Sequence, residues 1–157
     1  MSHWKKVLMG MVCAAALAGI ASDGQAQTVA GMAGHGWPDH FDGCFGSSWS
    51  RMVNNCGGSV GSQRLLIVPT QAYWYGWYNN VFARAAGNGS NGMTTCQALG
   101  IAADGSFGGA FSQNVSTNFS SSIQTLSLGS VFVPTSGTLH FECFVAQGGG
   151  QVVNVEF

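Results

Sequence analysis

The feature that most constrains the fold is a series of short apolar or alternating runs bounded by glycine or proline. In the clearest one, residues 137–147, every second residue from Leu139 to Val145 is apolar or cysteine. A period of two is typical of a half-buried β-strand, because successive side chains point to opposite faces. Beyond residues 1–26 and 71–86, no stretch keeps the helical period of 3.6 residues for three turns. The sequence therefore predicts an all-β fold.

Other runs of the same kind complete the predicted sheet structure. They are residues 48–53, 64–68, 93–103, 106–115, 122–128, 129–133 and 152–157. Asp104-Gly105 separates two of these runs and is a strong hairpin signal. The three glycines at 148–150 lie between the last two runs, which predicts a closing hairpin. Short strands joined by glycine-rich turns indicate an antiparallel β-sandwich of the Greek-key or jelly-roll kind.

The sequence of residues 71–86 is compatible with either a helix or a strand. Trp74, Trp77 and Val81 fit helical spacing. Tyrosine and tryptophan favour strands, however, and Gly76 would weaken a helix interior. We therefore favour a strand.

Residues 1–26 have the parts of a secretory signal peptide. Lys5 and Lys6 precede an apolar stretch at 7–20, and small residues follow it. That stretch is shorter than the ~20 residues of a membrane-spanning helix. We expect cleavage after Ala21 or Ala26, a periplasmic or extracellular product, and no membrane span once the signal is removed.

The cysteines indicate two disulfides. Loss of the signal peptide discards Cys13 and leaves an even set of four, Cys44, Cys56, Cys96 and Cys143. In an exported chain such a set predicts disulfides. We favour Cys44–Cys56, which flanks a short segment, and Cys96–Cys143, whose members lie within predicted strands. The spacing lacks the Cys-x2-Cys knuckle typical of structural zinc.

The predicted domain organisation is simple. Glycine and proline punctuate residues 27–43 without a clean period, so we expect an extended N-terminal arm or loop there. Residues 44–157 are predicted to form one β-sandwich domain, because a chain of this length buries enough surface for its own core.

Low charge excludes several functions. Only 7% of residues are charged, against about 25% in an ordinary soluble domain. Beyond residue 26 the chain has no lysine, three arginines and five carboxylates. It lacks a basic surface for nucleic acid and has few groups for an acid–base pair. We predict a non-enzymatic protein that uses no cofactor.

One segment concentrates titratable groups. His35, Asp39, His40 and Asp42 lie within eight residues. Imidazole and carboxylate groups can bind a cation or act as acid and base. A solvated polar loop is the simpler interpretation, and a metal site or a small hydrolase centre is the alternative. His140, beside Glu142 on an alternating run, is interpreted as an ordinary strand residue.

The aromatic run at 73–78 is the more suggestive feature. On a strand, Tyr73, Tyr75 and Trp77 would share one face, so that one set of rings points away from the core. Exposed rings beside amides offer sugars a stacking surface and hydrogen-bond partners. Burial of the outward set under the N-terminal arm is the alternative. The predicted ligand-binding residues are Tyr73, Trp74, Tyr75, Trp77, Tyr78 and Asn79.

Together these features predict an exported, non-enzymatic binding module with a glycan or another cell-surface component as its partner. Three alternatives stay open. One is a self-assembling cell-surface protein, in which low charge and exposed strand edges promote association. The second is the small hydrolase with its centre at residues 35–42. The third is a small outer-membrane β-barrel, suggested by the final Phe157 on an alternating run.

Overall fold

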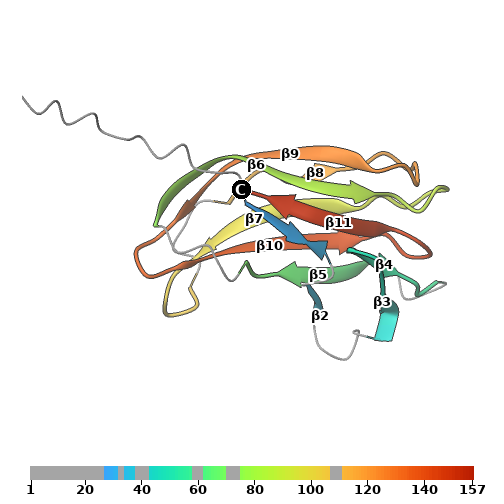
Figure 1. Cartoon of the computed structure of the whole chain (residues 1–157), viewed down its shortest axis with the longest axis horizontal. Coiled ribbons are helices and arrows are strands. Elements are labelled where there is room, and N and C mark those ends of the chain that lie inside the picture. The colour runs from blue at the N-terminus through green and yellow to red at the C-terminus, as the bar shows by residue number, and fades with distance from the viewer. Residues whose placement is uncertain (1–26, 32–33, 38–42, 58–61, 70–74, 107–110) are drawn as a thin grey trace, which may run out of the picture.

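The computed structural model describes residues 27–31, 34–37, 43–57, 62–69, 75–106 and 111–157. These residues form strands joined by turns and loops (Figure 1). The strands are β1 Thr28–Ala30, β2 His35–Trp37, β3 Phe45–Ser48, β4 Arg51–Asn54, β5 Gln63–Ile67, β6 Gly76–Ala86, β7 Thr95–Ile101, β8 Val115–Ser116, β9 Gln124–Val133, β10 Thr138–Val145 and β11 Gln151–Glu156.

The strands build two antiparallel sheets. The first has the order β3-β4-β11-β6-β9, with β1 also paired to β11, and the second has the order β2-β5-β10-β7-β8. The predicted all-β antiparallel sandwich is confirmed, as is the strand interpretation of residues 76–86. Residues 70–74 lie outside the described part. In the predicted arm, β1 joins the first sheet and β2 the second.

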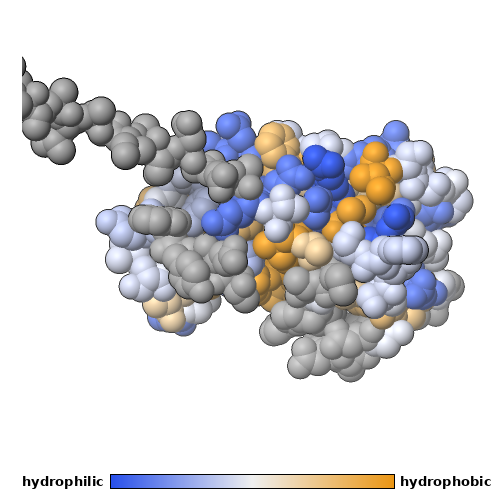
Figure 2. All heavy atoms as spheres, viewed as in Figure 1, coloured by the Kyte–Doolittle hydropathy of each residue, from blue (hydrophilic) through white to orange (hydrophobic). Residues whose placement is uncertain are grey.

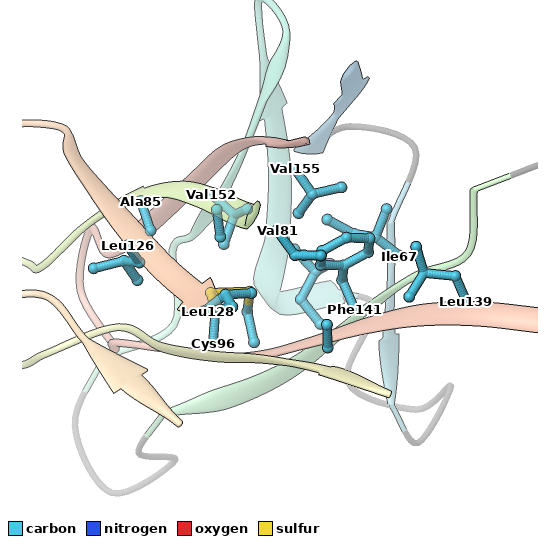
Figure 3. Packing of buried hydrophobic residues seen from close by; sticks show 14 of the residues in the cluster. Ile67, Val81, Ala85, Cys96, Leu126, Leu128, Leu139, Phe141, Val152 and Val155 are labelled. Carbon is cyan, nitrogen blue, oxygen red and sulfur yellow. A yellow bond between two sulfur atoms is a disulfide. The ribbon is translucent and has the colours of Figure 1, made fainter. Parts of the chain in front are cut away.

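The core lies between the facing sheets. Phe141 and Ile67 of the second sheet point toward Val81 and Val155 of the first (Figure 3). All four side chains are fully buried. Residues of β10 alternate between core and outer face, as the sequence pattern predicted.

Both predicted disulfides are present, Cys44–Cys56 and Cys96–Cys143. Cys96 and Cys143 occupy directly opposite positions on β7 and β10. Cys44 precedes β3 and Cys56 follows β4, so their bond closes the base of that hairpin. The two bonds are consistent with an oxidising, non-cytoplasmic compartment.

The predicted closing hairpin is wrong. β10 belongs to the second sheet and β11 to the first, so the chain changes sheets at residues 146–150. Gly148 and Gly149 have φ angles of 68° and 115°, which favour glycine. Their N–H groups donate to the carbonyls of Cys56 and Asn54, each at 2.8 Å. These bonds hold the corner against the end of β4.

Three further strand predictions were also inaccurate. Residues 48–53 are not one strand but parts of β3 and β4 with a turn between them. Residues 122–128 and 129–133 belong largely to one strand, β9. Of residues 106–115, the described part forms an isolated bridge between Phe111 and Leu99 and the start of β8. Gly129 lies within β9 at a register shift and has a φ of 84°, so it marks a bulge rather than a strand boundary.

The alternating pattern of residues 152–157 does not predict correctly which side chains of β11 face the core, because the strand contains an irregularity. Strict alternation would place Val152 and Val155 on opposite faces. The register shifts between Val152 and Asn154, and both valines are fully buried. A β-bulge inserts one residue and so reverses the alternation beyond it.

The turn at Asp104-Gly105 contains a carboxyl group whose pKa is lowered. Hydrogen bonds from Ser106, first from its side chain and then from its backbone N–H, hold the pKa of Asp104 below its ordinary value. The N–H bond is 2.9 Å long. Because the pKa of Asp104 is lower in the folded protein than in the unfolded chain, its ionised form stabilises the fold at pH values above the unfolded-state pKa. This stabilisation is lost as the pH falls through the folded-state pKa.

We therefore expect Ser106→Ala to raise the pKa of Asp104 toward its ordinary value. The substitution removes the hydroxyl but keeps the backbone N–H, so the shift should be partial. An NMR titration of the Asp104 carboxyl group measures it. Identical titration curves in the two proteins would contradict the assigned cause.

Candidate functional site: an exposed aromatic surface

The site is built on two neighbouring strands of the first sheet. Trp77 on β6 and Phe132 on β9 are directly opposite in the register. Their ring centroids lie 5.5 Å apart with the planes tilted by 58°. Trp77 is 62% exposed and Phe132 is half-buried. The pair therefore presents a wide aromatic area on the outer face of the sheet, with Trp77 supported from one side.

A bulge in β6 explains why Trp77 points outward. Its neighbour Tyr78 packs inward, in an edge-to-face arrangement with Phe157 at a centroid distance of 6.0 Å. The register then shifts between Tyr78 and Val81, and Asn80 has a φ of 58°. Asparagine is among the few residues that adopt this conformation readily. The bulge lets both Tyr78 and Val81 face the core.

Tyr75 is a further exposed ring, but strand pairing does not place it beside Trp77 or Phe132. It is 70% exposed and lies directly before β6. Between Tyr75 and Trp77, Gly76 has a φ of 126°, which is outside the range of an ordinary strand. The expected shared face of Tyr75 and Trp77 therefore cannot be inferred from sequence spacing. We define the aromatic surface as Trp77 and Phe132.

Polar groups lie next to the aromatic surface. Asn79 is exposed, and its Oδ1 accepts a hydrogen bond of 2.9 Å from the Ser130 hydroxyl. This bond orients the amide so that its NH₂ group is available as a donor. Exposed amide and hydroxyl groups beside rings are the partners that a sugar hydroxyl requires.

Charge is scarce around the aromatic surface. Arg84 is the single charged residue on β6 and β9, and it forms an ion pair of 3.0 Å with Glu156 of β11. In Figure 2, hydrophilic and neutral residues cover most of the described face, with hydrophobic residues in small groups among them. Apart from Arg84, the hydrophilic side chains of β6 and β9 are amides and hydroxyls, which suits a neutral ligand.

A close approach of the two sheets positions Phe132. Gly100 on β7 lies against the backbone of β9, and a Cβ atom there would collide with the carbonyl oxygen of Phe132. Glycine is therefore required at this position by space. The same contact holds the outer strand β9 close to the second sheet.

The predicted ligand residues divide into three groups. Tyr75, Trp77 and Asn79 are exposed, as a binding role needs. Tyr78 packs on the inner side and we leave it out of the site. Tyr73 and Trp74 lie outside the described residues. Sequence reasoning missed Phe132 and Ser130, because only the strand register shows that they neighbour Trp77 and Asn79.

The predicted histidine and aspartate segment is described only in part. His35 lies on β2, opposite Leu66 of β5. Asp39, His40 and Asp42 fall outside the described residues. Within the described ranges, no three histidine, cysteine, aspartate or glutamate residues are grouped so that they could hold a metal. The hydrolase hypothesis for residues 35–42 stays a prediction.

A buried ionic group lies on the outer face of the second sheet. Glu142 is only 3% exposed although it alternates with core residues on β10. One of its oxygens pairs with Nε of Arg64, and the other accepts a 2.6 Å hydrogen bond from Gln97. The Arg64 guanidinium also lies 6.0 Å from the centre of the Phe144 ring. Both carboxylate oxygens of Glu142 have partners within the sheet, so we interpret the interactions of Arg64, Gln97 and Glu142 as structural.

Comparison with known proteins identifies no relative. In the described part of the chain, no helix has the length and apolar character required to cross a bilayer. The sequence matches no family model, and no curated protein or solved structure is significantly similar to it.

Proposed function

We propose that this protein is an exported, non-enzymatic binding module that holds neutral glycan on the aromatic surface. The observation that carries the proposal is that Trp77 is 62% exposed on a sheet face where β6 and β9 together have one charged residue. A partner that covered the ring would remove apolar surface from water, which is favourable. Sugar CH groups would stack on the rings, and sugar hydroxyls would bond Asn79 and Ser130.

Preorganisation supports the proposal. Phe132 contacts one side of Trp77, and the hydrogen bond from Ser130 fixes Asn79. Side chains that are already ordered lose less conformational entropy when a ligand binds. The surface is therefore suited to weak but specific contact with a repeating polymer.

Trp77→Ala should lower retention on an insoluble neutral polysaccharide, or on a neutral glycan array, by at least about tenfold. Removal of a central tryptophan from a contact commonly costs about 2 kcal/mol or more. Phe119→Ala is the matched control, because Phe119 is also exposed but lies before the opposite end of β9. Retention is measured with dilute protein, and circular dichroism confirms that each variant is folded.

The outcome separates the proposal from its rivals. Loss of binding in the Trp77 variant with retention in the Phe119 variant supports the aromatic surface. Wild-type protein that binds no neutral glycan, or a Trp77 variant that binds as wild type does, would remove the proposal.

A further inference from the structure

Two asparagine–glycine pairs lie in the loop at residues 87–92, which follows the arrowhead of β6 (Figure 1). The pairs are Asn88-Gly89 and Asn91-Gly92. Asparagine before glycine is especially prone to deamidation, because glycine has no side chain to hinder attack by its backbone nitrogen on the asparagine amide. The two pairs are equivalent by sequence, but the fold surrounds them differently.

The amide of Asn88 is held by the fold on both sides. Its Oδ1 accepts hydrogen bonds from the backbone N–H groups of Ser90, Asn91 and Gly92, at 3.0, 3.1 and 2.8 Å. Its Nδ2 donates to the carbonyl oxygen of Gln147 at 3.0 Å. The Asn88 side chain therefore shapes the loop and joins it to the corner between β10 and β11.

The backbone nitrogen that would attack Asn88 is also held. The N–H of Gly89 donates to the carbonyl oxygen of Phe119 at 2.7 Å. Ring closure at Asn88 would expel Nδ2 as ammonia and bring Oδ1 next to the Gly89 nitrogen. It would therefore break the hydrogen bonds that the amide makes as well as the bond to Phe119.

The amide of Asn91 is held much more weakly. The residue is exposed, and within the described residues its side chain has one hydrogen-bond contact, between Oδ1 and the Ser90 hydroxyl at 3.4 Å. That distance exceeds the usual range for an O–H···O bond, and the same hydroxyl lies closer to Oδ1 of Asn88, at 3.2 Å. The attacking nitrogen of Gly92 has its bond to Oδ1 of Asn88 at 2.8 Å. Attack at Asn91 therefore breaks fewer bonds.

We propose that Asn91 is a site of spontaneous deamidation and that Asn88 is protected from the same reaction. The Gly92 nitrogen gives its proton to water and attacks Cγ of Asn91. A C–N bond forms, the Cγ–Nδ2 bond breaks, and Nδ2 takes up a proton from solvent and leaves as ammonia. Water then opens the five-membered imide at either carbonyl, which produces aspartate or isoaspartate. Overall, one water is consumed and one ammonia is released, without an oxidant or a reductant.

The modification changes both charge and backbone length in the loop. Glycine at position 92 is required by packing, because a Cβ there would lie 2.7 Å from Nδ2 of Asn88 and 2.9 Å from Cβ of Ala146. Isoaspartate at position 91 inserts one carbon into the backbone directly before this confined residue. We therefore expect the hydrogen bond from Gly92 to Asn88 to weaken and the N–H of Gly92 to exchange faster with solvent in the isoaspartate product.

The test is incubation of the folded protein, with its disulfides intact, at mildly alkaline pH. Peptide mapping with electron-based fragmentation then distinguishes asparagine, aspartate and isoaspartate at each position. Asn91 should convert at least about tenfold faster than Asn88, because several more hydrogen bonds must break at Asn88. In the reduced and denatured chain the two residues should convert at similar rates, because the difference comes from the fold.

The matched control is Asn91→Gln. It keeps an amide at position 91 but would have to form a larger ring, so it should remove the early conversion and leave the circular dichroism spectrum unchanged. Equal rates at the two asparagines in the folded protein would overturn the proposal, as would faster conversion at Asn88. So would an Asn91 that converts only in the denatured chain, or an Asn91→Gln variant that releases ammonia as fast as wild type. Trp77 lies near the start of β6 and the loop follows its end, so none of these results depends on glycan binding.

Discussion

Replacing Cys96 and Cys143 together with alanine is expected to lower the free energy of unfolding by about 4 kcal/mol. The bond joins residues separated by 47 positions, so it removes many conformations from the unfolded chain. Both sulfurs are also buried in the core, where their loss leaves a cavity. Guanidinium unfolding of the oxidised wild type and the double variant measures the difference.

The other disulfide is the natural comparison. Cys44 and Cys56 are separated by 12 positions, and the same model predicts about 3 kcal/mol for their removal. The Cys96–Cys143 variant should therefore unfold at the lower denaturant concentration. If the order were reversed, loop length would not be the dominant effect. Loss of native spectra in both variants under non-denaturing conditions would show that each disulfide is needed for folding.

Arg64→Ala is expected to destabilise the protein by roughly 3 kcal/mol, because it leaves the Glu142 carboxylate buried without its cation. Glu142 is 3% exposed, and its remaining partner in this group is the neutral amide of Gln97. The positive partner is less buried, since the Arg64 side chain is 35% exposed. The guanidinium can therefore recover hydration more readily than the carboxylate. Chemical unfolding with circular dichroism measures the loss.

The companion variants test whether charge or packing is responsible. Glu142→Gln keeps the shape of the side chain and removes its charge, so it should cost less than Arg64→Ala. Adding Glu142→Gln to Arg64→Ala should restore part of the lost stability, because no unpaired charge is then buried. Strictly additive losses in this double-mutant cycle would contradict coupling between the two side chains.

Local patterns predicted the elements that obey simple rules. The alternating residues of β10 and the apolar run of β5 were recognised because one or both faces of each strand are buried. The pairing Cys96–Cys143 followed from the positions of both cysteines within predicted strands. These features depend on the preference of each segment for an extended backbone and on the placement of its apolar residues.

Prediction failed where the path of the chain depends on distant contacts. The corner at Gly148 and Gly149 takes β11 to the first sheet because carbonyls of residues 54 and 56 accept its N–H groups. Nothing near the corner in sequence distinguishes it from a hairpin turn. The bulge at Asn80 likewise reverses the facing of β6 partway along the strand. Such choices reflect the packing of the whole sandwich.

For this protein, sequence alone determined the strand-rich character, the two disulfides, the low charge and the position of the aromatic candidates along the chain. Tertiary structure decided which rings are exposed and what surrounds them. It buried Tyr78 against Phe157, paired Trp77 with Phe132, and placed Trp49 on a separate hairpin. The reason is physical: composition and periodicity act within a few residues, whereas register, bulges and sheet crossings bring together residues separated by fifty or more positions.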